Sequence, residues 1–190
     1  MKNLVIHPED PSTTFLKPIY EKISDKVVIE KESCPLKIIN LIEKSNRIIA
    51  MGHGSIDGLF AIKLFSPVGN FPTLYTLFDS YAISKKHADI LRSKDQNVYI
   101  WCHANKFVDS NNLSGFYSGM FVSEVSEALF CGINATQEMV DESNNLFSKV
   151  VGEYIDLPKE ELYAKVVEEY GKLKESNPVA AYNLERLSVR

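Results

Sequence analysis

The stretch RIIAMGHG, residues 47–54, decides the fold. Residues 48–51 are all apolar, which is typical of a strand that is buried on both faces of a parallel sheet. The apolar run ends at Gly52-His53-Gly54, so a histidine directly follows the predicted strand. In open parallel sheets, ligands and catalytic groups gather at the carboxyl ends of the strands. We therefore expect His53 to lie in a functional site.

A second apolar run, NVYIWC at residues 97–102, ends at a cysteine that follows His53 by 49 residues. If the two strands are neighbours, His53 and Cys102 project from the same edge of the sheet. The thiolate is the nucleophilic form of cysteine, and histidine is the natural base to remove the thiol proton. The backbone N–H groups of Gly54 and Cys102 could hold the oxyanion of an acyl-transfer intermediate. The pattern predicts a His–Cys dyad.

The rest of the chain alternates short apolar runs with segments of helical periodicity. This order predicts an α/β fold, with a mostly parallel sheet, right-handed crossovers and helices on both faces. We expect an α/β domain over residues 1–155 and a helical C-terminal extension over residues 156–190 that packs on it. The pair Asp57-Gly58 indicates a hairpin just after His53.

The composition and charge argue against two classes of function, nucleic-acid binding and membrane insertion. The 190 residues include 21 Lys+Arg and 25 Asp+Glu, for a net charge of −4. The sequence has no basic stripe, so we expect no nucleic-acid partner. No apolar run approaches the roughly 18–20 residues that span a bilayer, and the N-terminal run is too short for a signal-peptide core. We therefore expect a cytoplasmic protein that is not in a membrane.

The cysteines and histidines indicate no scaffold or metal site. Cys34, Cys102 and Cys131 are an odd number without framework spacing, so a disulfide scaffold is not expected. Neither Cys-x-x-Cys nor His-x-x-x-His occurs, and no glycine-rich phosphate loop is present. We expect neither a metal nor another cofactor.

The two blocks, residues 47–54 and 97–102, resemble those of the caspase-like (clan CD) cysteine peptidases, which include the bacterial CHAT domains. In caspases the histidine lies about 50 residues before the cysteine. The resemblance covers roughly residues 1–135 and implies a caspase-like fold and a peptide or protein substrate. It also implies that His53 is the general base or acid, that Cys102 is the nucleophile, and that Gly54 contributes to the oxyanion hole.

The second block departs from the family pattern. Trp101 and His103 flank the cysteine, where the family usually has small residues. Two alternatives to a peptidase therefore stay open. One is a caspase-like binding module without catalysis, and the other is a thiol-dependent hydrolase of small molecules.

A third segment bears on specificity. In related bacterial domains, a Val-Ser-Asp or similar sequence after the cysteine block contributes an acid to the pocket for the residue at the cleaved bond. Val122-Ser123-Glu124 is similar, so the resemblance implies that Glu124 accepts a basic substrate side chain. The alternative is that Glu124 and Glu127 form the solvated face of a helix.

Overall fold

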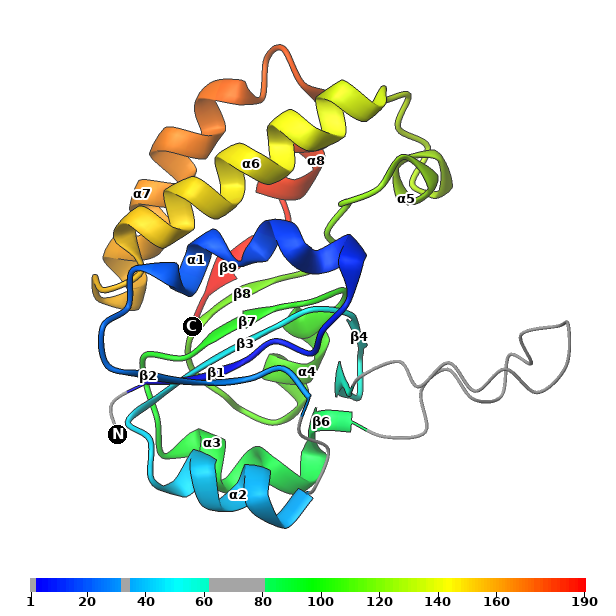
Figure 1. Ribbon diagram of the computed structural model, residues 1–190. Helices are drawn as coiled ribbons and strands as arrows, with labels where there is room; N and C mark the ends of the chain where they lie inside the picture. Colours follow the sequence, from blue (N-terminus) through cyan, green and yellow to red (C-terminus); the bar gives the residue numbers. More distant parts are fainter. Residues whose placement is uncertain (1–2, 32–34, 62–80) are drawn as a thin grey trace, which may run out of the picture.

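A computed structural model describes residues 3–31, 35–61 and 81–190, and Cys34 lies outside the described residues (Figure 1). The described part contains a six-stranded sheet in the order β2-β1-β3-β7-β8-β9. Neighbours in this sheet are parallel except β8 and β9, which are antiparallel. The predicted α/β class with a mostly parallel sheet is confirmed. The strands are β1 (Asn3–Ile6), β2 (Lys26–Ile29), β3 (Arg47–Met51), β7 (Val98–Ile100), β8 (Phe116–Ser118) and β9 (Leu187–Val189).

Helices cover both faces of this sheet (Figure 1). One face packs against α1 (Pro18–Glu21), α6 (Gln137–Tyr154), α7 (Lys159–Tyr170) and α8 (Pro178–Leu184). The other face packs against α2 (Pro35–Glu43), α3 (Ala88–Arg92) and α4 (Ala104–Ser110).

The central strand β3 shows why its sequence is apolar throughout. Ile49 and Met51 enter the core on the α6 side, whereas Ile48 and Ala50 enter the core on the α2 side. All four side chains are fully buried. Successive strand residues point to opposite faces, so a strand between two helical layers needs an apolar residue at every position.

A small antiparallel sheet follows β3 directly. It contains β4 (Gly54–Ser55), β5 (Gly58–Phe60) and β6 (Tyr81–Ser84), in that order. The turn between β4 and β5 is Ile56-Asp57, which is the hairpin that Asp57-Gly58 predicts.

The C-terminal segment completes the main sheet. Residues 156–190, expected as a helical extension, contain α7 and α8 but also supply the edge strand β9. Leu162, Val166 and Tyr170 of α7 are buried in the core beside the sheet. The segment is therefore part of the same core as residues 3–155.

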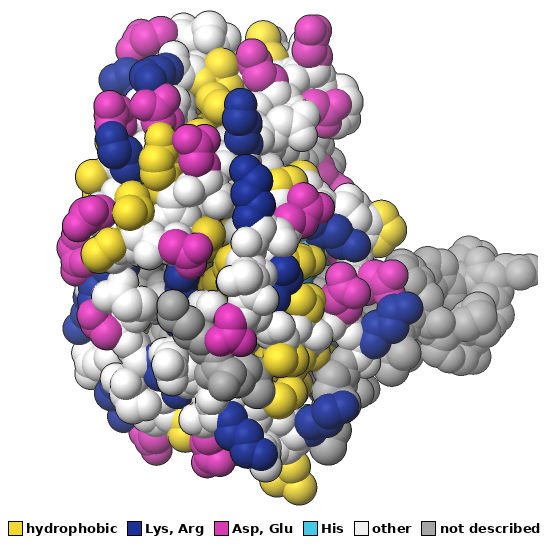
Figure 2. All heavy atoms as spheres, turned by 60° about the vertical axis from the view of Figure 1, so that its left-hand side comes forward, with side chains coloured by type: hydrophobic (Ala, Val, Ile, Leu, Met, Phe, Trp, Pro, Cys, Tyr) yellow, Lys and Arg dark blue, Asp and Glu magenta, His cyan; other side chains and the backbone are white. Residues whose placement is uncertain are grey.

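The outer surface of α7 is charged and solvated. Lys165 pairs with Glu168 within α7, and Glu169 of α7 pairs with Lys172 just beyond its end. Figure 2 shows acidic and basic side chains interspersed over the face that is turned forward there. None of the described helices is long and apolar enough to cross a membrane.

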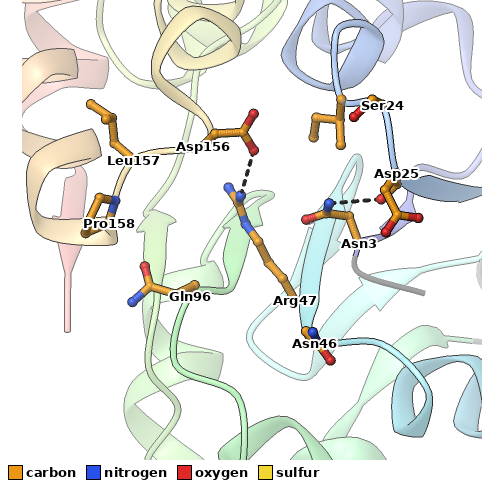
Figure 3. A pocket seen from close by; sticks show the side chains of 10 residues that line it. Asn3, Ser24, Asp25, Asn46, Arg47, Gln96, Asp156, Leu157 and Pro158 are labelled. Carbon is orange, nitrogen blue, oxygen red and sulfur yellow. Dashed lines mark hydrogen bonds and ion pairs between the residues drawn. The ribbon is translucent and has the colours of Figure 1, made fainter.

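Arg47 links the sheet to the end of α6. Its side chain is 12% exposed and lies in a pocket at the edge of the sheet where β3 begins (Figure 3). The guanidinium donates a hydrogen bond to the carbonyl of Ile155, the residue that caps α6, and it lies 3.5 Å from the Asp156 carboxylate. A cation is favourable at the C-terminal end of a helix, where carbonyls lack backbone partners.

Replacing Arg47 with methionine should lower the free energy of unfolding by about 1–3 kcal/mol, because the Ile155 carbonyl loses its partner in a largely buried setting. Urea denaturation measures this change. Lys165→Met, on the exposed face of α7, is the control and should leave stability nearly unchanged. Equal stabilities of the Arg47→Met protein and the wild type would show that this contact does not hold α6 to the sheet.

Candidate functional site

His53 and Cys102 leave adjacent parallel strands at the same edge of the sheet. Strand β3 pairs with β7, and just after β3 the Gly52 amide still donates to the carbonyl of Ile100, the last residue of β7, at 3.0 Å. His53 and Cys102 line one small pocket, which Phe121 and Gly52 also help to form. The expectation that the two apolar strands are neighbours is therefore confirmed.

Cys102 lies in a tight turn between β7 and α4. The next residue, His103, has a φ of 68°, in the left-handed region that residues with a side chain rarely adopt. Its amide donates to the Gly119 carbonyl at 3.2 Å, which holds the turn in place. His103 is exposed and lies outside the pocket lining, whereas the Cys102 amide makes no hydrogen bond to another described residue. Such strained turns are common at functional sites.

The thiol of Cys102 is held in its protonated form. Its Sγ donates a weak hydrogen bond to the Phe121 carbonyl at 3.7 Å. Burial, and next the nearby Glu127 carboxylate, raise the pKa of Cys102 to about 11. Within the described residues no hydrogen bond joins His53 to Cys102. The resting site therefore holds a neutral thiol, whereas a preformed dyad would lower the pKa of the thiol.

Glu127, rather than Glu124, is the acid in the pocket. It belongs to α5 (Val125–Phe130), and its Oε2 accepts hydrogen bonds from the amide and the hydroxyl of Ser123, at 2.8 and 3.0 Å. Glu124 precedes α5, is exposed, and lines a neighbouring groove instead. The spacing of three residues in the sequence does not show whether Glu124 or Glu127 enters the pocket, because that depends on the residue at which α5 begins.

The packing of Trp101 accounts for the large side chain that stands directly before Cys102. It is 1% exposed, and its Nε1 donates to the Ser55 carbonyl at 3.1 Å, which fastens the β4–β5 hairpin to β7. A Cβ atom on Gly54 would lie 2.2 Å from Trp101 Cδ1, so a side chain at position 54 cannot coexist with this tryptophan. The pair Trp101 and Gly54 therefore acts as a unit that holds the hairpin beside Cys102.

The same packing directs the amide of Gly54. The Phe60 amide donates to the His53 carbonyl at 2.9 Å, and Gly54 is the next position, paired with Leu59. Hydrogen-bonded and non-hydrogen-bonded pairs alternate along antiparallel strands. The Gly54 N–H therefore points away from β5, toward the free edge of the hairpin.

Asp10 and Ser12 hold His53 in a way that the sequence did not reveal. They belong to the segment that leads into and forms the short helix η1 (Pro11–Leu16), where Asp10 is the N-terminal cap. The Ser12 hydroxyl lies 2.7 Å from His53 Nε2 and 2.7 Å from Asp10 Oδ1. The Ser12 amide also donates to Asp10 Oδ1, at 2.9 Å. Ser12 and His53 lie 41 positions apart in the chain, so their contact is a tertiary one that no local pattern encodes.

These distances assign the protons on His53. A carboxylate only accepts, so the Ser12 hydroxyl donates its proton to Asp10. The Ser12 oxygen then accepts from His53, which places the imidazole proton on Nε2. The lone pair of a neutral imidazole is therefore on Nδ1, and this atom is able to take a proton.

His7 helps to hold in place the short helix η1, which carries Ser12. It is 2% exposed, and its two ring nitrogens lie 3.1 Å from the Tyr20 hydroxyl and 3.1 Å from the Thr13 hydroxyl. Burial, and next the charge of Lys17, lower the pKa of His7 to about 4. His7 is therefore neutral at pH 7 and acts as a hydrogen-bonded link between β1 and η1. In the described part of the chain, no three His, Cys, Asp or Glu side chains are placed to hold a metal ion.

Glu127→Gln should lower the pKa of Cys102, because it removes a negative charge that disfavours the thiolate. Burial remains as the larger cause, so the pKa should stay above that of an ordinary cysteine. The rate of alkylation of Cys102 by iodoacetamide at pH 8, mapped by mass spectrometry, should rise. Glu138→Gln, an equal charge change on the exposed start of α6, is the control. A Cys102 rate that responds equally to both variants would contradict a local effect of Glu127.

Comparisons with known proteins assign the chain to no family. No model of a protein family matches the chain, and no curated protein matches it. The resemblance to caspase-like peptidases therefore rests on the two sequence blocks, and the chemistry of the pocket rests on its geometry.

Proposed function

We propose that this protein is a cysteine hydrolase, and specifically a caspase-like peptidase in which Cys102 is the nucleophile and His53 the general base. The observation that carries the proposal is the shared pocket at the carboxyl edge of β3 and β7, which both side chains line. The carboxyl edge is where parallel sheets place their catalytic groups.

The first step is proton transfer from the Cys102 thiol to His53 Nδ1. The imidazolium keeps its Nε2 proton on Ser12, whose hydroxyl is bonded to Asp10. The Asp10 carboxylate, 3.7 Å from Nε2, stabilises the positive charge that forms there. Asp10 and Ser12 are positioning residues in this scheme, in the way that a carboxylate orients the histidine of a serine protease.

The thiolate then attacks the carbonyl carbon of the peptide bond, and the electron pair of the C=O bond moves to the oxygen. The N–H groups of Gly54 and Cys102 receive this oxyanion. The C–N bond breaks as His53 gives its proton to the leaving amine, which yields a thioester on Cys102. Water then attacks the thioester, His53 takes a proton from the water, and the departing sulfur receives that proton as the carboxylic acid product is released.

The charges around the pocket favour a basic residue at the cleaved bond. With a pKa of about 11, roughly one thiol in ten thousand is ionised at pH 7. A lysine or arginine side chain beside Glu127 neutralises the charge that opposes the thiolate. Glu124, at the adjoining groove, extends the acidic surface toward the rest of the substrate.

A non-catalytic binding module of the same architecture is the second candidate. The raised pKa of Cys102 favours this alternative, because it keeps the thiol protonated and unreactive. A thiol-dependent hydrolase of small molecules is the third, and it shares the dyad but not the substrate.

Fluorogenic peptides that differ only at the cleaved position test the function. The wild type should cleave after arginine or lysine, and both Cys102→Ala and His53→Ala should lose at least 100-fold in kcat/KM. Both variants should keep the melting temperature of the wild type within a few degrees, which shows that the fold is intact. Cleavage that survives Cys102→Ala would remove this residue as nucleophile. A wild type that cleaves no peptide would favour the binding module, or a small-molecule substrate if Cys102 alkylates faster than Cys131.

The positioning role of Ser12 predicts a loss in kcat with little change in KM. Ser12→Ala should reduce kcat about 10-fold or more, because a misplaced base is less effective in proton transfer. Ser12→Thr keeps the hydroxyl and should restore most of the activity. Thr14→Ala is the matched control, since the Thr14 hydroxyl bonds only to the backbone of the same short helix. If Ser12→Ala and Thr14→Ala have equal kcat values, the link through Ser12 plays no part.

A further inference from the structure

A groove beside the Cys102 pocket presents acceptors and negative charge. One wall is η1, a second is the segment 123–126 at the start of α5, and the third is α6 through Gln137, Asp141 and Asn144. The groove shares Phe15 and Ser123 with the pocket that holds Cys102, so the two spaces adjoin.

Asn144 gives this groove a buried acceptor without a partner. Its side chain is 6% exposed, and its Nδ2 donates to the Ser123 carbonyl at 2.9 Å. That bond fixes the orientation of the amide, because an exchange of oxygen and nitrogen would bring two acceptors together. The Asn144 Oδ1 atom is buried and has no hydrogen-bond partner among the described residues. Buried polar atoms are almost always paired, so this oxygen calls for a donor that the chain itself does not supply.

The charges of the lining point to the same kind of donor. Glu124 and Asp141 carry carboxylates, whereas none of the described residues that line the groove is a lysine, arginine or histidine. The hydroxyl protons of Ser12 and Thr14 are already donated, to Asp10 and to the Pro11 carbonyl. A ligand for this groove therefore needs a positive charge and several N–H donors.

We infer that the groove is a second cation subsite, which binds the guanidinium of an arginine that flanks the cleaved bond of the substrate. A guanidinium carries five N–H donors in a fixed planar fork, so one group can serve both the Asn144 oxygen and a carboxylate. The inference rests on the proposed peptidase function and extends it, since it makes the preferred substrate a peptide with two basic residues.

Binding to the Cys102→Ala protein tests the subsite without relying on catalysis. The probes are fluorescent peptides with lysine at the cleaved position and arginine at each flanking position in turn, together with the same peptides carrying citrulline, which is neutral and nearly isosteric. Fluorescence anisotropy should show at least 10-fold tighter binding of one arginine peptide than of its citrulline partner. Equal affinities at every position would overturn the subsite.

Three variants locate the effect. Asp141→Asn and Asn144→Ala should each remove most of the preference for arginine over citrulline, while Glu138→Gln, which changes the charge equally on the same helix outside the groove lining, should keep it. A loss of preference with Glu138→Gln as large as with Asp141→Asn would show general electrostatic attraction and overturn the site. The Asn144→Ala result is read only against a melting temperature near that of the wild type, and Asp141→Asn, at an exposed position, tests the site by itself if Asn144→Ala unfolds.

Two further outcomes separate the source of the cation and the function. Spermidine that displaces the arginine peptide at equal or lower concentration would show that the groove prefers free polyamines, which overturns a peptide subsite. Preferential binding of the arginine peptide by a wild type that cleaves nothing would support the groove and contradict the peptidase. Cleavage by the wild type with no arginine preference would contradict the groove and leave the peptidase intact.

Discussion

The pairing of β3 with β7 is the constraint on which the site depends. The two strands are parallel, with Met51 opposite Ile100, and the Gly52 amide just after β3 donates to the carbonyl of Ile100 at the end of β7. This hydrogen bond sets how far β3 and β7 run side by side before the backbone of each turns away from the sheet. His53 and Cys102 follow shortly after the two residues that form this bond, so the register of the strands determines where both side chains lie. The apolar residues on both faces of β3 hold the strand between its helical layers.

The features that could be predicted from the sequence are those encoded by local pattern. Apolar runs located β3 and β7, the Asp57-Gly58 pair located the hairpin, and the alternation of apolar runs with segments of helical periodicity indicated the α/β class. Strand β9 has only three residues, and a segment that short has no periodicity to detect. Its place in the sheet depends on β8, about 70 positions earlier in the chain.

The parts of the candidate site that could not be predicted are contacts between distant segments. Ser12 meets His53 across 41 positions, and Trp101 meets Ser55 across 46. In the sequence, no local pattern connects Ser12 with His53, and Trp101 is only a departure from the family pattern next to the cysteine. The tertiary structure gives each a different meaning, because η1 packs beside the turn after β3 and the hairpin packs on the indole. Glu127 differs from Glu124 for a similar reason, since the first residue of α5 decides which carboxylate faces Cys102.

The electrostatic environments of His53 and Cys102 differ, and under the proposed function this difference would connect activation of the thiol to the choice of substrate. The Asp10 carboxylate lies 3.7 Å from His53 Nε2, whereas burial and Glu127 oppose a negative charge on the Cys102 sulfur. Moving a cation into the pocket would offset this opposition, because opposite charges in a partly buried site attract more strongly than in water. Under the proposed function, a basic substrate would supply the positive charge that the described residues do not place beside Glu127. In that scheme, recognition of the substrate and ionisation of the proposed nucleophile would be the same electrostatic event, and a neutral peptide of equal shape would bind without activating the thiol.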